Sequence, residues 1–260
     1  MKERGVDFIK IYDELTPEAF FGITDEANKL HLDFAGHVPL TIDPSQASEA
    51  GMKSIEHAEI PLFLECSEIG DEMRVKVINL FTGEDGELDY SKGKKVNELM
   101  FEMVKTFDSI KCEEMYKTLK SNNTWFVPTL SHLELYYPNT QDWKDNPNVK
   151  YMPKAEYDFF NDEFEPIMRE YRSPYIPEVE GMRKQLVIDM HKAGVGLLAG
   201  TDFGEVGLIG GFSLHKELLS LQDVGLTPLE VLKTATLNPA KYQNAIDSLG
   251  TIEIGKIADM

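Results

Sequence analysis

The chain has 260 residues, 42% of them hydrophobic and 27% charged, which is ordinary for a folded globular protein. Its formal net charge of −19 argues against nucleic acid and against an anionic membrane surface as partners, because both carry negative charge. No apolar run is long enough to span a membrane, so a soluble protein is expected.

The first part of the chain alternates predicted strands and helices. The pattern predicts strands over residues 6–12, 33–38 and 53–57. A helix beginning at Thr16-Pro17 follows the first strand, and a short helix beginning at Asp43-Pro44 follows the second. This βαβαβ order is typical of a parallel sheet.

The regular alternation is lost between residues 59 and 123, where several glycines interrupt the pattern. A helical pattern returns over 96–120, and a strand is predicted over 124–130. Residues 136–177 form a long irregular segment, which is typical of a lid or substrate-binding element but also of a tolerated surface excursion.

The last third of the chain is regular again. A helix over 182–193 precedes a buried strand over 195–199, which runs into the sequence AGTDFG. Two further helices are predicted, over 212–224 and from the capping box Thr227–Glu230 to about residue 239. The simplest fold for these strand–helix units is part of a (β/α)₈ barrel; an open doubly wound sheet is the alternative, although no glycine-rich nucleotide-binding motif accompanies it.

Three predicted strands carry a metal-binding type of side chain at or near their carboxyl ends: His37, His57 and Asp202. A parallel barrel would bring these side chains together, and imidazole with carboxylate suits Zn²⁺. Each has an ordinary alternative, since a histidine at a strand end can be a hydrogen-bonded polar residue and Asp202 can cap a helix or close a turn.

Lys10 lies within the apolar strand sequence DFIKIY. A buried ammonium without compensation is unfavourable, so Lys10 must reach solvent, an acid or a functional site. One alternative is an ion pair with an acid such as Glu56. The other is a carbamate, formed by adding carbon dioxide to the neutral amine, whose oxygens could bridge two metal ions.

Cys66 and Cys112 are the two cysteines of the chain. They are too few for a disulfide framework or for a sulfur-rich metal site, so reduced thiols are expected.

Several segments together resemble the later part of an amidohydrolase-superfamily enzyme, of the imidazolonepropionase-like and prolidase-like kind. They are DFIKIY, FAGHV, SIEHA, WFVPTL, LLAGTDFG, GFSLHKEL, GLTPLEVLKTATLNPAK and LGTIEIGKIADM. The resemblance implies strands about four to eight of a TIM-type barrel over residues 1–247, with an insertion around 60–122. Residues 248–260 would begin the return to a small β-sandwich domain.

The resemblance also implies a site and a reaction. Lys10, His37, His57 and Asp202 would bind one or two divalent ions, with zinc expected. A metal-activated water would hydrolyse a C–N bond in a small amide, peptide-like or cyclic amide substrate. Asp202 would act as base and then as acid, and His57 would help to polarise the scissile carbonyl.

One feature of the family is missing from this chain: the His-x-His pair of the first barrel strand. The chain is therefore expected to be an incomplete fragment or a truncated descendant. Two other hypotheses stay open, a catalytically silent partial barrel that depends on a partner chain and an open-sheet binding module without metal. The open edges of an incomplete sheet would favour a homo-oligomer.

Three further residues are candidates for substrate contact. His215 follows the Asp202 loop, although it can equally be a polar residue of a surface helix. Tyr136 and Tyr137 follow the fourth strand and can equally be aromatic packing. The sequence leaves the compartment open between cytoplasmic and exported.

Overall fold

A computed structural model describes residues 5–57, 59–81, 92–131, 145–166, 173–204 and 207–258. The chain divides into two compact units. The first unit comprises Met1–Val127 and Ser173–Gly196, and the second comprises Pro128–Arg172 and Leu197–Met260. No helix among the described residues is both long enough and apolar enough to cross a membrane.

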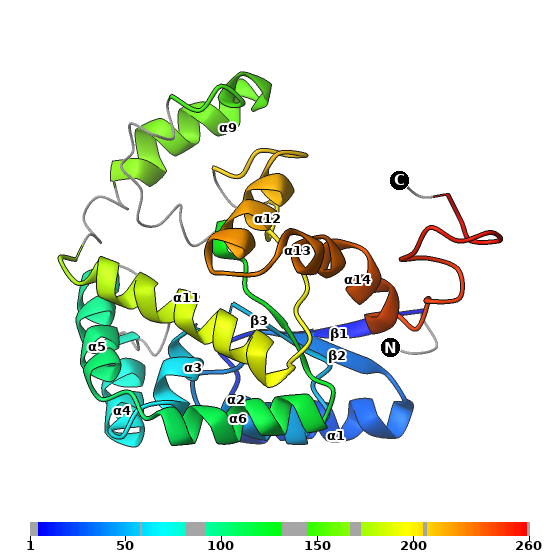
Figure 1. Ribbon diagram of the computed structural model, residues 1–260. Helices are drawn as coiled ribbons and strands as arrows, with labels where there is room; N and C mark the ends of the chain where they lie inside the picture. Colours follow the sequence, from blue (N-terminus) through cyan, green and yellow to red (C-terminus); the bar gives the residue numbers. More distant parts are fainter. Residues whose placement is uncertain are drawn as a thin grey trace. The chain divides into compact units, whose positions relative to one another are not determined.

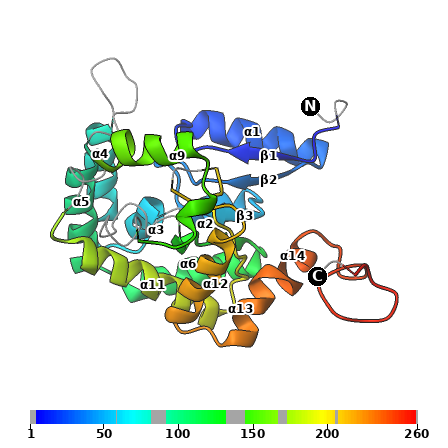
Figure 2. The same cartoon turned by 90° about the horizontal axis from the view of Figure 1, so that it is seen from above.

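The first unit is built on a four-stranded parallel sheet in the order β1-β2-β3-β4, so the parallel arrangement predicted for the strands is confirmed (Figure 1). Figure 2 shows β1, β2 and β3 running alongside one another. The elements of this unit are β1 (Phe8–Ile11), α1 (Pro17–Leu30), β2 (Asp33–Gly36), α2 (Pro44–Glu49), β3 (Ser54–Glu56), α3 (Glu59–Glu65), α4 (Gly70–Phe81), α5 (Gly93–Lys105), α6 (Ser109–Ser121), β4 (Trp125–Val127) and α11 (Ile176–Ala193).

Helix α1 shows why the local predictions hold. The Thr16 hydroxyl accepts a hydrogen bond from Ala19 N at 3.2 Å, which caps the helix where the sequence predicted its start. Phe20 and Ala27 face the core, and His31 ends the helix in the left-handed conformation. Helix α1 packs on β2 and so completes the first βαβ unit.

The region predicted to be irregular, residues 59–123, is largely helical in the described residues. Gly70 and Gly93, two of the glycines that interrupt the sequence pattern, are the first residues of α4 and α5. A glycine therefore marks a helix boundary here and not a loop. The predicted helical stretch over 96–120 is two helices, α5 and α6.

The expectation of reduced thiols was wrong. Cys66 and Cys112 form a disulfide that joins the chain just after α3 to α6, with a Cα–Cα distance of 4.8 Å. A cysteine count could not predict this pair, because the fold brings together residues that are 46 positions apart.

The strand predicted over 195–199 is not formed as a regular strand; within this stretch the structure has a single bridge residue, Leu197. Gly196 nevertheless lies beside β4, since its carbonyl accepts a hydrogen bond from Phe126 N at 2.8 Å. The indole of Trp125 packs closely over Gly196, where a Cβ atom would lie 2.6 Å from Cζ3 of the ring.

The second unit contains η3 (Val149–Tyr151), α9 (Lys154–Phe159), the π-helix η4 (Phe160–Phe164), α12 (Ser213–Asp223), α13 (Pro228–Ala235) and α14 (Leu237–Tyr242). Met152, Phe160 and Ile209 form a small buried cluster. The predicted capping box is confirmed, because Thr227 and Glu230 exchange hydrogen bonds at the start of α13. The described residues after α14 form turns and bends.

The packing at Gly196 predicts an asymmetry between two glycine substitutions. Gly196→Ala should lower the free energy of unfolding by about 1–3 kcal/mol, because the new methyl group would overlap the Trp125 ring. Gly22→Ala, in an open position of α1, should raise it by about 0.5–1 kcal/mol. Urea denaturation of both variants measures this; equal effects would contradict the described packing.

Candidate metal centre

Strands β2 and β3 end side by side, since Gly36 pairs with Ile55 in the parallel register. His37 follows β2 directly, and its backbone N–H donates to the Ile11 carbonyl at 3.1 Å. His57 follows β3 directly, and its N–H donates to the Val127 carbonyl at 3.1 Å. Neighbouring strands therefore fix the backbone of both histidines at the carboxyl end of the sheet, where α/β folds place ligands.

The side chains of the two histidines lie close together, and that of Glu56 joins them. Each of His37, Glu56 and His57 offers one ligand atom, and these atoms lie within 4.8 Å of one another. The two imidazole rings have centroids 4.8 Å apart and are perpendicular. All three residues are partly buried. Two imidazoles and a carboxylate are a donor set that suits Zn²⁺ and related divalent ions.

Glu56 was predicted only as a partner for Lys10 and was missed as a possible ligand. In a regular strand, successive side chains point to opposite faces, so Glu56 and His57 would diverge. His57 instead has a φ of 45°, in the left-handed region, at the point where β3 ends. The change of backbone direction lets two adjacent side chains serve one site, and residue spacing alone does not indicate it.

Lys10 forms an ion pair with Glu56, so the simpler of its two predicted roles is present in the structure. Lys10 lies on β1 and Glu56 on β3, so the lysine side chain must cross the intervening strand β2. Gly36 makes this possible, because a Cβ atom there would lie 3.0 Å from Lys10 Cδ. The Lys10 side chain is 40% exposed and that of Glu56 is 22% exposed, so the pair is not sealed from water.

The imidazole of His37 has two neighbours, Tyr12 and Asp13. The Tyr12 ring stacks on it with a centroid distance of 4.4 Å. Asp13 Oδ2 lies 3.9 Å from His37 Nδ1, while Asp13 Oδ1 is buried and accepts no hydrogen bond from the described part of the chain. When one ring nitrogen of a histidine binds a metal, a carboxylate beside the other nitrogen commonly fixes the orientation of the ring.

The other predicted site residues are not among the described residues of the first unit. Asp202 and His215 belong to the second unit and are exposed, His215 on α12. Asp202 has a φ of 56°, an unusual conformation that Asp tolerates better than most residues. Tyr136 and Tyr137 lie outside the described residues. The first unit therefore groups Lys10, His37 and His57, and adds Glu56.

Comparison with known proteins identifies a family. The model of the amidohydrolase family matches residues 13–260. A search of curated proteins finds no match.

Solved structures share the fold at low sequence identity. They include a Xaa-Pro dipeptidase with methionine bound in its active site, 19% identical with a TM-score of 0.56, over 99% of this chain and 48% of that one. A bottromycin amidohydrolase is 19% identical with a TM-score of 0.62, over 94% and 48%. The A. niger ochratoxinase is 17% identical with a TM-score of 0.51, over 99% and 44%. The chain thus spans about half the length of each of these proteins.

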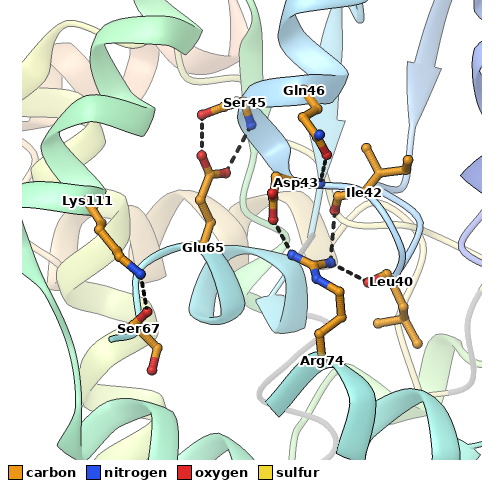
Figure 3. Close-up of polar contacts among 9 residues, drawn as sticks. All are labelled: Leu40, Ile42, Asp43, Ser45, Gln46, Glu65, Ser67, Arg74 and Lys111. Carbon is orange, nitrogen blue, oxygen red and sulfur yellow. Dashed lines mark hydrogen bonds and ion pairs between the residues drawn. The ribbon is translucent and has the colours of Figure 1, made fainter. Parts of the chain in front are cut away.

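A separate cavity of about 340 Å³ lies among α2, α3, α4 and α6, and none of the candidate metal ligands lines it. Figure 3 shows polar contacts of three of its lining residues: Ser45 donates from its backbone N–H and its hydroxyl to Glu65, and Asp43 pairs with Arg74. Burial raises the pKa of the Glu65 carboxyl, although the hydrogen bonds from Ser45 oppose the shift.

The raised pKa of Glu65 predicts a pH dependence of stability. The folded chain holds this proton more tightly than the unfolded chain, so the contribution of Glu65 to stability falls as pH rises from its ordinary value of 4.5 through the folded pKa. Glu65→Gln should lose this dependence and gain stability relative to wild type as pH rises. Urea denaturation between about pH 4 and 8 measures it.

Glu98→Gln, on the exposed side of α5, is the matched control and should follow the wild-type pH profile. Parallel profiles for wild type and Glu65→Gln would contradict the prediction.

Proposed function

The chain belongs to the amidohydrolase family, and from this premise we propose that it is a metal-dependent hydrolase of C–N bonds in small amide or peptide-like substrates. The observation that carries the proposal is the group of His37, Glu56 and His57 at the ends of adjacent parallel strands. The family is typically metal-dependent, and this donor set fits a divalent ion. A dipeptidase among the structural relatives supports the substrate class, since its structure holds an amino acid in the active site.

We assign metal binding to His37 and His57, with Glu56 in reach as a third ligand. A divalent ion bound there, zinc by the chemistry of the donors, would supply a Lewis acid for a carbonyl and for water. Asp202 and a carbamate on Lys10 are the two further ligands that we propose, the second for a site with two ions.

The two roles of Lys10 exclude each other in a single molecule. The ion pair with Glu56 requires the protonated ammonium. A carbamate requires the neutral amine, which forms an N–C bond to carbon dioxide and loses a proton, so the side chain becomes an anion. Glu56 would then repel Lys10 unless a cation lay between them.

We assign proton transfer to Asp202. An exposed carboxylate can accept a proton from the attacking water and deliver it to the leaving amine, as general base and then general acid. His57 would polarise the scissile carbonyl. His215, Tyr136 and Tyr137 stay predictions as substrate contacts.

We further propose that the chain corresponds to strands four to eight of the family barrel, with the boundaries that the sequence predicted: a barrel portion over 1–247 with an insertion around 60–122, and a β-sandwich return over 248–260. One support is that this chain matches about half the length of its structural relatives. Another is β1, an edge strand of the sheet that the described residues form, on which Phe8 is exposed.

The same edge favours a second candidate function, a silent partial barrel that needs a partner chain. An edge strand with an exposed aromatic residue such as Phe8 offers backbone hydrogen-bonding groups and apolar surface to another polypeptide or to a second copy. Metal binding separates the two candidates, because the silent barrel does not require it.

The proposed site predicts metal retention that depends on two of the six histidines. The chain, loaded with zinc and desalted, should keep close to one ion per chain, and His37→Ala and His57→Ala should each lose most of it. Elemental analysis by mass spectrometry measures the ratio. His31→Asn, at the exposed end of α1, should retain zinc as wild type does. Wild type without zinc, or variants that retain it fully, would overturn the site.

The position of Asp13 beside His37 predicts a smaller effect on zinc binding than the loss of a histidine. Asp13→Asn should weaken zinc binding by about 10–100-fold, because the carboxylate beside His37 Nδ1 supports the ligand without touching the ion. Competition with a chromogenic chelator measures the affinity. Asp25→Asn, on the exposed face of α1, is the matched control. If both variants bind zinc equally well, Asp13 has no such role.

A further inference from the structure

The chain contains two cysteines, and the fold brings them together. Cys66 directly follows α3, Cys112 lies in α6, and each is only 1% exposed. Their Cα atoms are 4.8 Å apart, within the range that a disulfide requires.

Backbone hydrogen bonds join the segment after α3 to the segment before α6. Asp108 N donates to the Cys66 carbonyl at 2.7 Å, and Glu68 N donates to the Thr106 carbonyl at 2.8 Å. Ser67 and Phe107 form an antiparallel bridge between these two bonds. We call residues 66–68 with 106–112 the α3–α6 joint. Its hydrogen bonds join the same two segments as the disulfide.

Side chains add to the joint. The Ser67 and Thr106 hydroxyls lie 2.8 Å apart, and Lys111 Nζ donates to the Ser67 carbonyl at 2.9 Å (Figure 3). The cavity lined by Leu64, Glu65 and Lys111 lies against it. Backbone and side-chain hydrogen bonds therefore both hold the α3–α6 joint together.

Two other uses of a cysteine pair do not fit this position. Among the described residues, the group of side chains spaced for a metal ion is His37, Glu56 and His57, and it contains no cysteine. A catalytic or redox-sensing thiol needs access to solvent, whereas both sulfurs here are buried.

We propose that the functional protein carries Cys66–Cys112 as a permanent structural disulfide and that the chain is built for an oxidising compartment, such as the periplasm or the cell exterior. Disulfides persist there, and a reducing cytosol keeps thiols free. Bond formation removes one proton from each thiol and two electrons in all. The electrons reduce the disulfide of a thiol–disulfide oxidoreductase, which becomes a dithiol.

The bond has a structural consequence for the first unit. It closes a loop of 46 residues that contains α4 and α5. It also anchors the end of α3, a helix that begins at Glu59, two residues after His57. The disulfide thus restrains the helical segment between β3 and β4. This segment includes α3, which follows the candidate metal ligand His57.

The test uses the full chain produced in a bacterial periplasm. Alkylation after denaturation, without reductant, should label no thiol, and mass spectrometry should find the peptides of Cys66 and Cys112 linked. Reduction should lower Tm by roughly 5–15 °C, because the closed loop no longer restrains the unfolded chain. In the native state the bond should resist a mild dithiol that reduces it readily in urea.

The double variant Cys66→Ala/Cys112→Ala is the control: its Tm should lie near that of reduced wild type and should not respond to reductant. Free thiols in the periplasmic protein, an unchanged Tm on reduction, or prompt reduction of the native protein would each overturn the proposal. Wild type with and without reductant decides the question even if the double variant does not fold.

Discussion

The close approach of β1 and β2 at Gly36 is the constraint on which the candidate site depends. A side chain at this position would collide with the Ile11 carbonyl and with Lys10 Cδ. Because glycine is there, Lys10 can cross β2 to Glu56, and the Ile11 carbonyl is free to accept the His37 N–H. One small residue therefore sets the position of a histidine and allows an ion pair that spans three strands. The φ of 131° at Gly36 is a further reason why another residue would be strained there.

Local patterns were sufficient for part of the fold and for part of the site. Threonine and proline at the helix starts predicted α1 and α13, because a helix cap depends on neighbours in sequence. The alternation of strands and helices predicted the parallel sheet, because a helix between two strands allows them to pair in the same direction. His37 and His57 were predicted to meet because parallel strands end at a common edge. Glu56 was not predicted as a ligand, since its orientation depends on the left-handed backbone of His57.

Two features of the packing were not indicated by the sequence. The disulfide depends on how α3 and α6 pack, and the two cysteines carry no local signal for it. The stretch 195–199 has the composition of a buried strand, yet strand structure also requires a ladder of hydrogen bonds, and Gly196 makes a single bond to Phe126. The apolar composition predicts that this stretch is buried, but a strand forms only where a neighbouring strand supplies the hydrogen bonds.

The central claim is that the imidazoles of His37 and His57 bind the same divalent ion. X-ray absorption spectroscopy of the chain loaded with one zinc ion tests it most directly. We expect imidazole scattering from two histidines with a Zn–N distance of about 2.0–2.1 Å, and the loss of one imidazole in His37→Ala. A spectrum with oxygen ligands alone, or one unchanged by His37→Ala, would contradict it.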